Sequence, residues 1–374
     1  MKVTTRNGKI HEVDEELNPN VASTAGASPF YNLRPILGNF NWAIFYILLG
    51  GRQAGKSYSV TDFFLHQFTE KNIPFYWLRL TETQSRKLLT NNAERLVDPD
   101  LRRRYNLDIT TNSTNVYQVT KRTKPDVNGK TKIVEKKLMA RVLALSTFYQ
   151  DKGSLFDKDF LDDPNMVYNI AVDEFQREKG EKNTFDILYA LTNQLENLVR
   201  NTKKRIRIFF LGNTLEEASE ILAAFNFIPE EFGRYKLKSK RCLIDYIEPT
   251  EEYKKMRAGS IAEILMPTAS TFTNKIDVDN TLIDKNTKLL KPQYIIKFTK
   301  DKSNWFTVWN NNIVTKYNNE KIKAVAMRPY LDELFNAGLQ ANIINIFDTR
   351  SFLFRNMIDF KRFQSQLELL KPRK

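Results

Sequence analysis

The chain has 374 residues, 41% of them hydrophobic, which is enough apolar material for more than one packed core. It has no run of 18 apolar residues and no secretory signal pattern, so neither a membrane span nor secretion is expected. The single cysteine, Cys242, excludes an internal disulfide framework and fits a reducing compartment, and with only two histidines a His/Cys metal site is not expected.

The net charge of +14 is spread unevenly along the chain. Residues 231–374 hold 26 Lys and Arg against 16 Asp and Glu, a balance of +10, whereas residues 1–230 have a balance of +4. A basic C-terminal part behind a nearly neutral one favours a polyanionic partner, most simply nucleic acid. A basic protein without such a partner is the alternative, because charge alone discriminates weakly.

The first elements predict a phosphate-binding loop. Residues 1–29 are polar and predict a flexible arm, the apolar run 44–49 predicts a strand, and residues 57–68 predict a helix with one apolar side. Between strand and helix the sequence fits the pattern G-x-x-x-x-G-K-[ST] of a P-loop. The matching residues are Gly50, Gly51, Arg52, Gln53, Ala54, Gly55, Lys56 and Ser57.

This strand–loop–helix context is the one that a nucleoside triphosphate requires. Glycines let backbone N–H groups approach the phosphates, and the helix N-terminus adds a favourable dipole. We therefore expect residues 50–58, the last of which is Tyr58, to bind ATP. Lys56 would reach the β- and γ-phosphates, and Ser57 would ligate Mg²⁺.

A second strand is predicted over residues 73–80 and a helix over 81–89. Residues 115–146 then predict a hairpin with a turn at Asn128-Gly129 and a further strand over 138–145. The hairpin is basic, and this is compatible either with an edge strand protected by lysines or with contact to a phosphate backbone. Its basic residues are Lys121, Arg122, Lys124, Lys130, Lys132, Lys136 and Lys137.

The apolar run 166–172 predicts a buried strand that ends in Asp173 and Glu174, the pattern of a Walker B segment. Asp173 would hold Mg²⁺ opposite Ser57, and Glu174 would polarise or orient the attacking water. Because side chains alternate along a strand, two neighbouring carboxylates reach one site only where the strand ends. Alone, such a pair is better explained as a helix cap; together with a P-loop it favours ATP hydrolysis.

Two further polar residues follow predicted elements near this site. A helix over 185–199 ends at Arg200, a candidate arginine finger for a neighbouring subunit or simply a cation at a helix C-terminus. A strand over 206–211 is followed by Asn213, placed where P-loop ATPases keep a sensor of the γ-phosphate.

A domain boundary is expected at 226–240, which gives a P-loop ATPase domain over 30–230 and a second domain over 231–374. The segment 242–247 predicts a strand. Antiparallel strands are then predicted, followed by closing helices; the strands are 294–298, 305–309, 313–317 and 322–327, and the helices are 331–335 and 352–370.

From about Asn41 to its end, the chain resembles the DNA-packaging ATPases of small tailed phages, which are related to large terminase subunits. Arg52 at the third place of the P-loop is typical of such motors. The segment 172–175 followed by Arg177-Glu178-Lys179 is similar to the family's Walker B region, and 199–201 before a basic run is similar to its arginine-finger region. The hairpins at 294–327 resemble its second domain. In relatives with an active nuclease that domain holds clustered carboxylates for metal ions, and Asp245 lies where such a ligand could be, without clear partners.

The resemblance implies an α/β fold: an N-terminal ASCE ATPase domain on a mostly parallel sheet, and a C-terminal α+β RNase H-like domain that is a vestigial nuclease. It implies ATP and Mg²⁺ as cofactors and Glu174, Arg200, Arg52 and Asn213 as catalytic residues. It also implies a homo-oligomeric ring, of five subunits, that docks on the portal of an empty capsid and moves double-stranded DNA. Such a motor works in the host cytoplasm, contacts no membrane and is absent from the mature virion; some relatives add a packaging RNA.

Several other functions remain open at this point. A P-loop helicase or recombination ATPase would prefer single strands, and a terminase with an active nuclease would carry a cluster of carboxylates. A small-molecule kinase would need no basic second domain. A structural protein with a degenerate nucleotide site is disfavoured by the intact Lys56, Ser57, Asp173 and Glu174.

Overall fold

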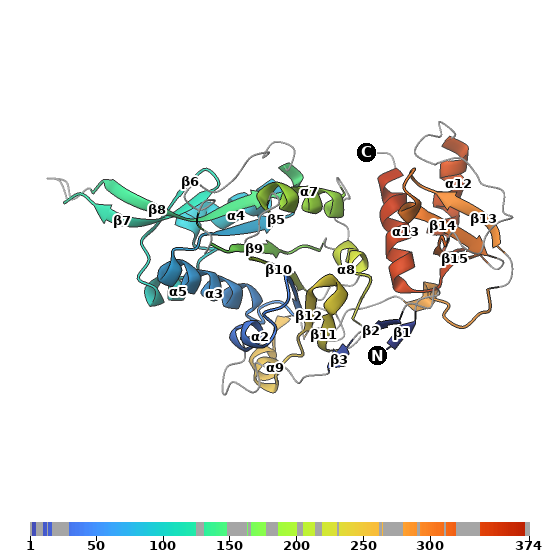
Figure 1. Cartoon of the computed structure of the whole chain (residues 1–374), viewed down its shortest axis with the longest axis horizontal. Helices are drawn as coiled ribbons and strands as arrows, with labels where there is room; N and C mark the ends of the chain where they lie inside the picture. The colour runs from blue at the N-terminus through green and yellow to red at the C-terminus, as the bar shows by residue number, and fades with distance from the viewer. Residues whose placement is uncertain are drawn as a thin grey trace. The chain divides into compact units, whose positions relative to one another are not determined.

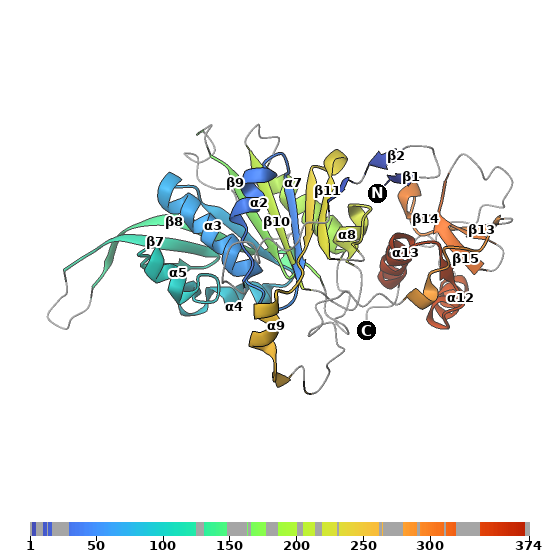
Figure 2. The same cartoon turned by 90° about the horizontal axis from the view of Figure 1, so that it is seen from below.

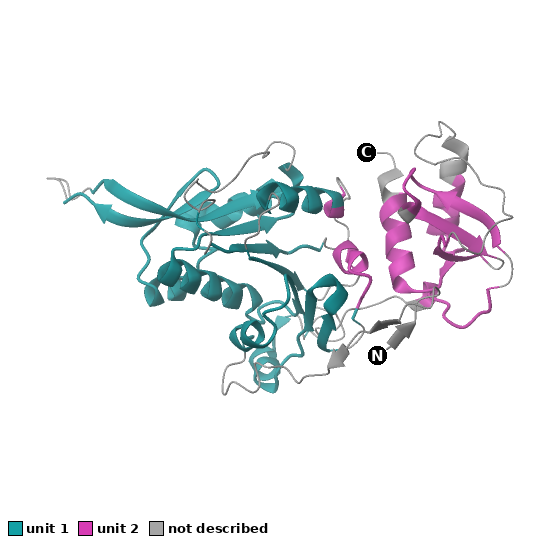
Figure 3. Cartoon of the chain, viewed as in Figure 1, with its two compact units in different colours: residues 1–176, 189–214, 229–275 teal, residues 177–188, 215–228, 276–374 magenta. Residues whose placement is uncertain are grey.

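The computed structural model forms two compact units, coloured separately in Figure 3. The first comprises residues 1–176, 189–214 and 229–275, and the second comprises 177–188, 215–228 and 276–374. The described residues are 2–4, 10–12, 14–16, 30–124, 131–147, 163, 166–176, 186–199, 205–213, 219–229, 232–261, 264, 280–289, 292–309, 312–318 and 337–370.

The first unit is built on a ten-stranded sheet of order β3-β11-β12-β4-β10-β9-β5-β8-β7-β6 (Figure 1). The strands from β12 to β8 in this order run parallel, and those outside them pair antiparallel, so the expected mostly parallel α/β sheet is confirmed. The strand bounds are β3 Asp14–Glu16, β4 Phe45–Gly50, β5 Phe75–Arg79, β6 Ile109–Asn112, β7 Asn115–Arg122, β8 Ile133–Ala144, β9 Tyr168–Asp173, β10 Ile206–Asn213, β11 Gly233–Leu237 and β12 Cys242–Tyr246.

Helices cover both faces of this sheet, with α3 and α7 on opposite sides (Figure 1). This follows from the strand order, because right-handed crossovers leading in opposite directions along a sheet place their helices on opposite faces. The helix bounds are α2 Arg34–Asn39, α3 Lys56–Lys71, α4 Glu82–Ala93, α5 Pro99–Arg104, α7 Ile187–Val199 and α9 Glu251–Arg257. The predicted α3 and α7 are thus confirmed.

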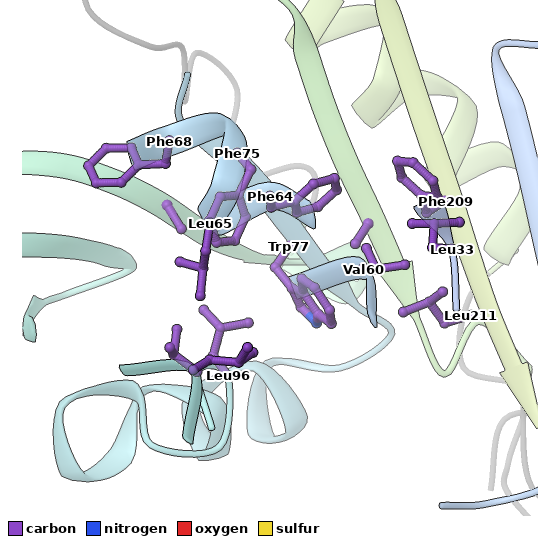
Figure 4. Close-up of a cluster of buried hydrophobic side chains, with 14 of the residues drawn as sticks. Leu33, Val60, Phe64, Leu65, Phe68, Phe75, Trp77, Leu96, Phe209 and Leu211 are labelled. Carbon is purple, nitrogen blue, oxygen red and sulfur yellow. The ribbon is translucent and has the colours of Figure 1, made fainter. Parts of the chain in front are cut away.

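The core under α3 is aromatic and holds the P-loop strand against its neighbours (Figure 4). Phe64 of α3 packs edge-on against Phe209 of β10 and Trp77 of β5, with ring centroids 5.5 and 6.4 Å apart. All three side chains are buried. Central strands buried on both faces appear in the sequence as continuous apolar runs, which is why they could be predicted.

The predicted boundary at 226–240 does not coincide with the edge of the sheet. β11 and β12, which were expected in the second domain, are strands of the first unit, because β12 pairs in parallel with β4. An apolar run indicates a strand but not its partner, so this pairing was not visible in the sequence. Within the described residues 219–229, the helix α8 spans Glu220–Ala224 and belongs to the second unit.

The second unit contains the four-stranded sheet β13-β14-β15-β16. Its first three strands are antiparallel, as predicted, and its core is aromatic, with Phe363 packed against Phe298 and Phe306 at 5.1 and 5.2 Å. The bounds are β13 Pro292–Lys297, β14 Trp305–Trp309, β15 Ile313–Lys316, β16 Leu353–Phe354, α12 Ala337–Asp348 and α13 Met357–Leu370. The helix predicted from 352 therefore starts later, after β16 pairs with β15.

Some expectations lie outside the described residues, namely the strand 322–327, the helix 331–335 and most of the N-terminal arm. Within residues 1–16, β1 (Lys2–Thr4) pairs with β2 (Ile10–Glu12), and β3 pairs with β11. Across the described parts of the chain, no helix has the length and apolarity needed to cross a membrane.

Asp245, which the sequence suggested as a possible metal ligand of the second domain, is instead a buried structural group of the first unit. Its Oδ2 accepts hydrogen bonds from the Tyr31 hydroxyl at 2.8 Å and from Arg234 Nη2 at 3.1 Å. The Arg234 and Asp245 side chains are only 5% and 9% exposed. This contact ties the segment before α2 to β11 and β12.

We predict that Asp245→Ala destabilises the first unit by about 3–5 kcal/mol, because it leaves the Arg234 charge buried without its partner. The matched control is Asp108→Ala, which breaks an ion pair with Arg122 whose side chains are 49% and 37% exposed; it should cost at most about 1 kcal/mol. Urea unfolding of both variants measures the difference. Equal shifts in the two variants would contradict a structural role for the Asp245 pair.

Candidate active site

The P-loop occupies the turn between β4, which ends at Gly50, and α3, which begins at Lys56. Gly55 has φ of 85°, and a Cβ there would lie 2.9 Å from Phe30 Cβ, so both backbone conformation and space require glycine. The Tyr31 N–H donates to the Ala54 carbonyl at 2.9 Å. The segment before α2 therefore packs directly on the loop.

Lys56 is folded back into the loop. Its Nζ donates to the carbonyls of Gly50 at 2.8 Å and Gly51 at 2.7 Å, and the side chain is buried. Burial lowers the pKa of Lys56 to about 8, and the negative charge of Asp173 partly offsets this shift. The amine is still charged at pH 7, and phosphate oxygens could replace the two carbonyls as its acceptors.

The ends of three parallel strands bring the predicted residues together. In register, Asn213 of β10 lies opposite Gly50 of β4, and Leu211 of β10 lies opposite Asp173 of β9. The carboxyl ends of parallel strands meet at one edge of a sheet, which is where α/β proteins bind ligands. The Walker B pair and Asn213 therefore lie beside the start of the P-loop.

Ser57 and Asp173 fit the ligand set of a small divalent cation. The Ser57 Oγ and Asp173 Oδ1 are 3.4 Å apart. Two oxygen ligands at right angles around Mg²⁺, each about 2.1 Å from the ion, would be about 3 Å apart. A small movement of either side chain would complete this geometry.

Glu174 reaches the same place as Asp173 because the chain turns sharply after the strand. Its φ is 51°, a left-handed conformation that is uncommon outside glycine, and its N–H donates to the Leu211 carbonyl at 2.9 Å. In a continuing strand the two side chains would point to opposite faces. The turn at the end of the strand therefore lets both carboxylates reach one site, as the sequence pattern required.

A residue that the sequence analysis did not single out connects both carboxylates. Arg79, at the end of β5, lies 2.9 Å from Asp173 with its Nη2, and its Nη1 forms an ion pair with Glu174. Its side chain is only 13% exposed. Burial raises the pKa of Asp173, and the Arg79 guanidinium opposes that rise. The sequence shows only a basic residue at the end of a predicted strand, because the pairing of β5 with β9 is visible only in the structure.

The other predicted residues are placed as follows. Arg52 is exposed, and its carbonyl accepts hydrogen bonds from α9. The Tyr58 hydroxyl donates to Asp100 at 2.7 Å and accepts from Arg104 at 3.0 Å, so it faces α5, and burial with the Asp100 carboxylate raises its pKa to about 12. Arg200 lies outside the described residues.

No protein-family model matches the chain. The chain is similar to the DNA packaging protein of Bacillus phage phi29, with 23% identity over 290 residues, 76% of this chain and 74% of the relative. Its fold resembles the Phi-28 gp11 DNA packaging motor, with a TM-score of 0.62 and 15% identity over 93% of this chain and all of that one. It also resembles a chain of the bacteriophage Phi-29 viral genome packaging motor assembly, with a TM-score of 0.57 and 20% identity over 91% and 100%.

These comparisons confirm the resemblance to phage DNA-packaging proteins that the motifs predicted. At these identities the solved structures support the fold, whereas the roles of individual residues rest on the geometry described above.

We predict that Arg79→Ala destabilises the nucleotide-free protein by about 3–5 kcal/mol, because the buried Asp173 loses its cation and keeps Glu174 as a like charge beside it. Adding Mg²⁺ should restore part of the loss by supplying a cation at the same carboxylates. Thermal unfolding with and without Mg²⁺ measures both effects.

The matched control is Arg86→Ala, which breaks an ion pair with Glu82 on the surface of α4, where the two side chains are 77% and 51% exposed. It should change stability by less than about 1 kcal/mol, with no response to Mg²⁺. An Arg79→Ala variant as stable as this control would show that the pairing does not hold the carboxylates.

Proposed function

We propose that this chain is the ATP-hydrolysing motor that moves double-stranded viral DNA through the portal into a preformed capsid. The observation that carries the proposal is the meeting of Lys56, Ser57, Asp173 and Glu174 beyond the carboxyl ends of β4 and β9, the two strands that flank β10. Similarity over three quarters of the chain to a protein named for DNA packaging supplies the biological setting.

The geometry suggests how hydrolysis proceeds. Lys56 would exchange its loop carbonyls for β- and γ-phosphate oxygens. Ser57 and Asp173 would hold Mg²⁺, whose charge would neutralise that of the phosphates. Glu174 then accepts a proton or a hydrogen bond from the attacking water. To do so, its carboxylate leaves the Arg79 guanidinium, so the ion pair keeps the nucleotide-free site inactive.

Further residues complete the proposed cycle. Arg200 from a neighbouring subunit, or Arg52 from the same chain, would neutralise charge in the transition state. Asn213, in register with Gly50, would sense the γ-phosphate and report its loss to the rest of the sheet. A finger supplied by the neighbour ties each hydrolysis event to the state of the ring.

The assembly follows from the resemblance. We propose a homo-oligomeric ring of five subunits docked at the portal vertex, present in the host cytoplasm during assembly and absent from the virion. The second unit would be a vestigial RNase H-like nuclease that grips DNA, and a packaging RNA is a further candidate partner. A helicase is the second candidate function, and it would prefer single-stranded DNA.

The proposal predicts ATPase activity that double-stranded DNA stimulates more than single-stranded DNA. Glu174→Gln should lower kcat by about 10²–10⁴-fold and leave KM within a few fold, because it removes the base but not the phosphate contacts. Steady-state ATPase assays of the assembled protein measure both constants.

The control variant is Glu94→Gln, an exposed carboxylate near the end of α4, which should behave as the wild type. Unchanged turnover in Glu174→Gln would remove Glu174 from the mechanism, and stronger stimulation by single strands would favour the helicase.

We propose that the outer part of the β7–β8 hairpin contacts DNA phosphates. β6 pairs with β7 only as far as Gln118, and beyond it the two strands extend alone from the body of the unit (Figures 1 and 2). The side chains of residues 120–124 and 131–137 in this part are exposed, and Glu135 is its one described acid. Its described basic residues are Lys121, Arg122, Lys124, Lys132, Lys136 and Lys137.

Replacing Lys124, Lys132 and Lys137 by Gln should weaken binding to all duplex sequences equally. The slope of log K against log salt should also become shallower by about one for each phosphate that the variant no longer neutralises. The control replaces the exposed Lys71, Lys87 and Lys240, which makes the same change in net charge elsewhere. If both triple variants show the same fall in affinity and the same slope, the hairpin does not hold the DNA.

A further inference from the structure

Two side chains of α9 converge on one backbone carbonyl of the P-loop. The Tyr253 hydroxyl donates to the Arg52 carbonyl at 2.5 Å, and Arg257 Nη1 donates to the same oxygen at 3.3 Å. Arg257 also donates to the Tyr253 hydroxyl at 2.9 Å and lies over its ring. Loop carbonyls usually bind water, so two protein donors on this one are a specific arrangement.

The donors on α9 are held rigidly. Tyr253 is only 2% exposed, and its N–H donates to Thr250 Oγ1, the N-cap of α9. The helix follows β12 directly, where the Ile247 N–H donates to the Leu49 carbonyl at 2.8 Å. The chain that leads into α9 is therefore hydrogen-bonded to β4, the strand that carries the P-loop.

Fixing this carbonyl also fixes the next N–H. The peptide bond is planar and trans, so the Arg52 carbonyl and the Gln53 N–H point in opposite directions. With its carbonyl on α9, the Arg52–Gln53 peptide directs the Gln53 N–H away from α9. Gln53 adopts φ of 65°, and successive N–H groups in such conformations form anion-binding concavities.

We propose that Tyr253 and Arg257 are positioning residues of the P-loop, which hold the Arg52–Gln53 peptide so that the Gln53 N–H binds a phosphate of the nucleotide. This role rests on the proposed nucleotide site. The two donors lie on α9, outside the residues of the P-loop pattern. Without these donors the peptide is free to rotate. Nucleotide binding must then order the loop, and this cost weakens the affinity for the nucleotide.

The test is the affinity for a non-hydrolysable Mg-ATP analogue, measured by titration calorimetry. Tyr253→Phe keeps the ring and removes only the donor, and it should weaken binding about 3- to 10-fold, the range expected for removing one hydrogen bond. Arg257→Gln should weaken it less, since its contact with the carbonyl is longer. In ATPase assays KM should rise by the same factor as the dissociation constant, with kcat within about twofold.

The control is Tyr105→Phe, which removes a hydroxyl that donates to Asp62 at 2.9 Å, away from the loop. Its nucleotide affinity should equal that of the wild type, and all three variants should unfold within a few degrees of it without nucleotide. If Tyr253→Phe loses its fold, Arg257→Gln decides alone.

Lys56→Ala separates this inference from the function on which it rests. If the wild type binds the analogue and Lys56→Ala does not, the nucleotide site stands, and wild-type affinity in Tyr253→Phe and Arg257→Gln overturns only the positioning role. If the wild type itself does not bind the analogue, the proposed function fails first.

Discussion

The structure depends on the register of three parallel strands, β4, β10 and β9. Their carboxyl ends lie at one edge of the sheet, so the P-loop, Asn213 and the Walker B pair meet without any long side chain having to reach across. Aromatic packing under α3 supports this arrangement, because Phe209 of β10 stacks on Tyr46 of β4 and packs against Phe64 of α3. Packing away from the candidate site therefore helps to position its residues.

The site places three charged side chains, Lys56, Asp173 and Arg79, in largely buried positions, and each has a partner within the chain. Lys56 is bound to two loop carbonyls, and Asp173 and Glu174 share Arg79. Charges in such places cost free energy unless they are paired, and the loop carbonyls and Arg79 supply that pairing within the chain. In the proposed cycle, phosphates and a metal ion would take the place of these partners.

Local patterns predicted the parts of the site that are formed by residues close to one another in the sequence. Gly55, Lys56 and Ser57 follow a strand and open a helix, and Asp173 and Glu174 close an apolar run, so each was visible in the sequence. Arg79, Tyr253 and the Asp245 pair were not, because their partners are distant in sequence and no pattern states which strands will be adjacent. The domain boundary was misplaced for the same reason, since β12 returns to pair with β4.

The most direct test of the account is a structure of the assembled protein with Mg²⁺ and a non-hydrolysable ATP analogue. The account predicts phosphate oxygens within hydrogen-bond distance of Lys56 Nζ, which will have left at least one of the Gly50 and Gly51 carbonyls. It also predicts the ion between Ser57 and Asp173, and Glu174 separated from Arg79. A nucleotide bound elsewhere, with Lys56 still on both carbonyls and Arg79 still on both carboxylates, would contradict it.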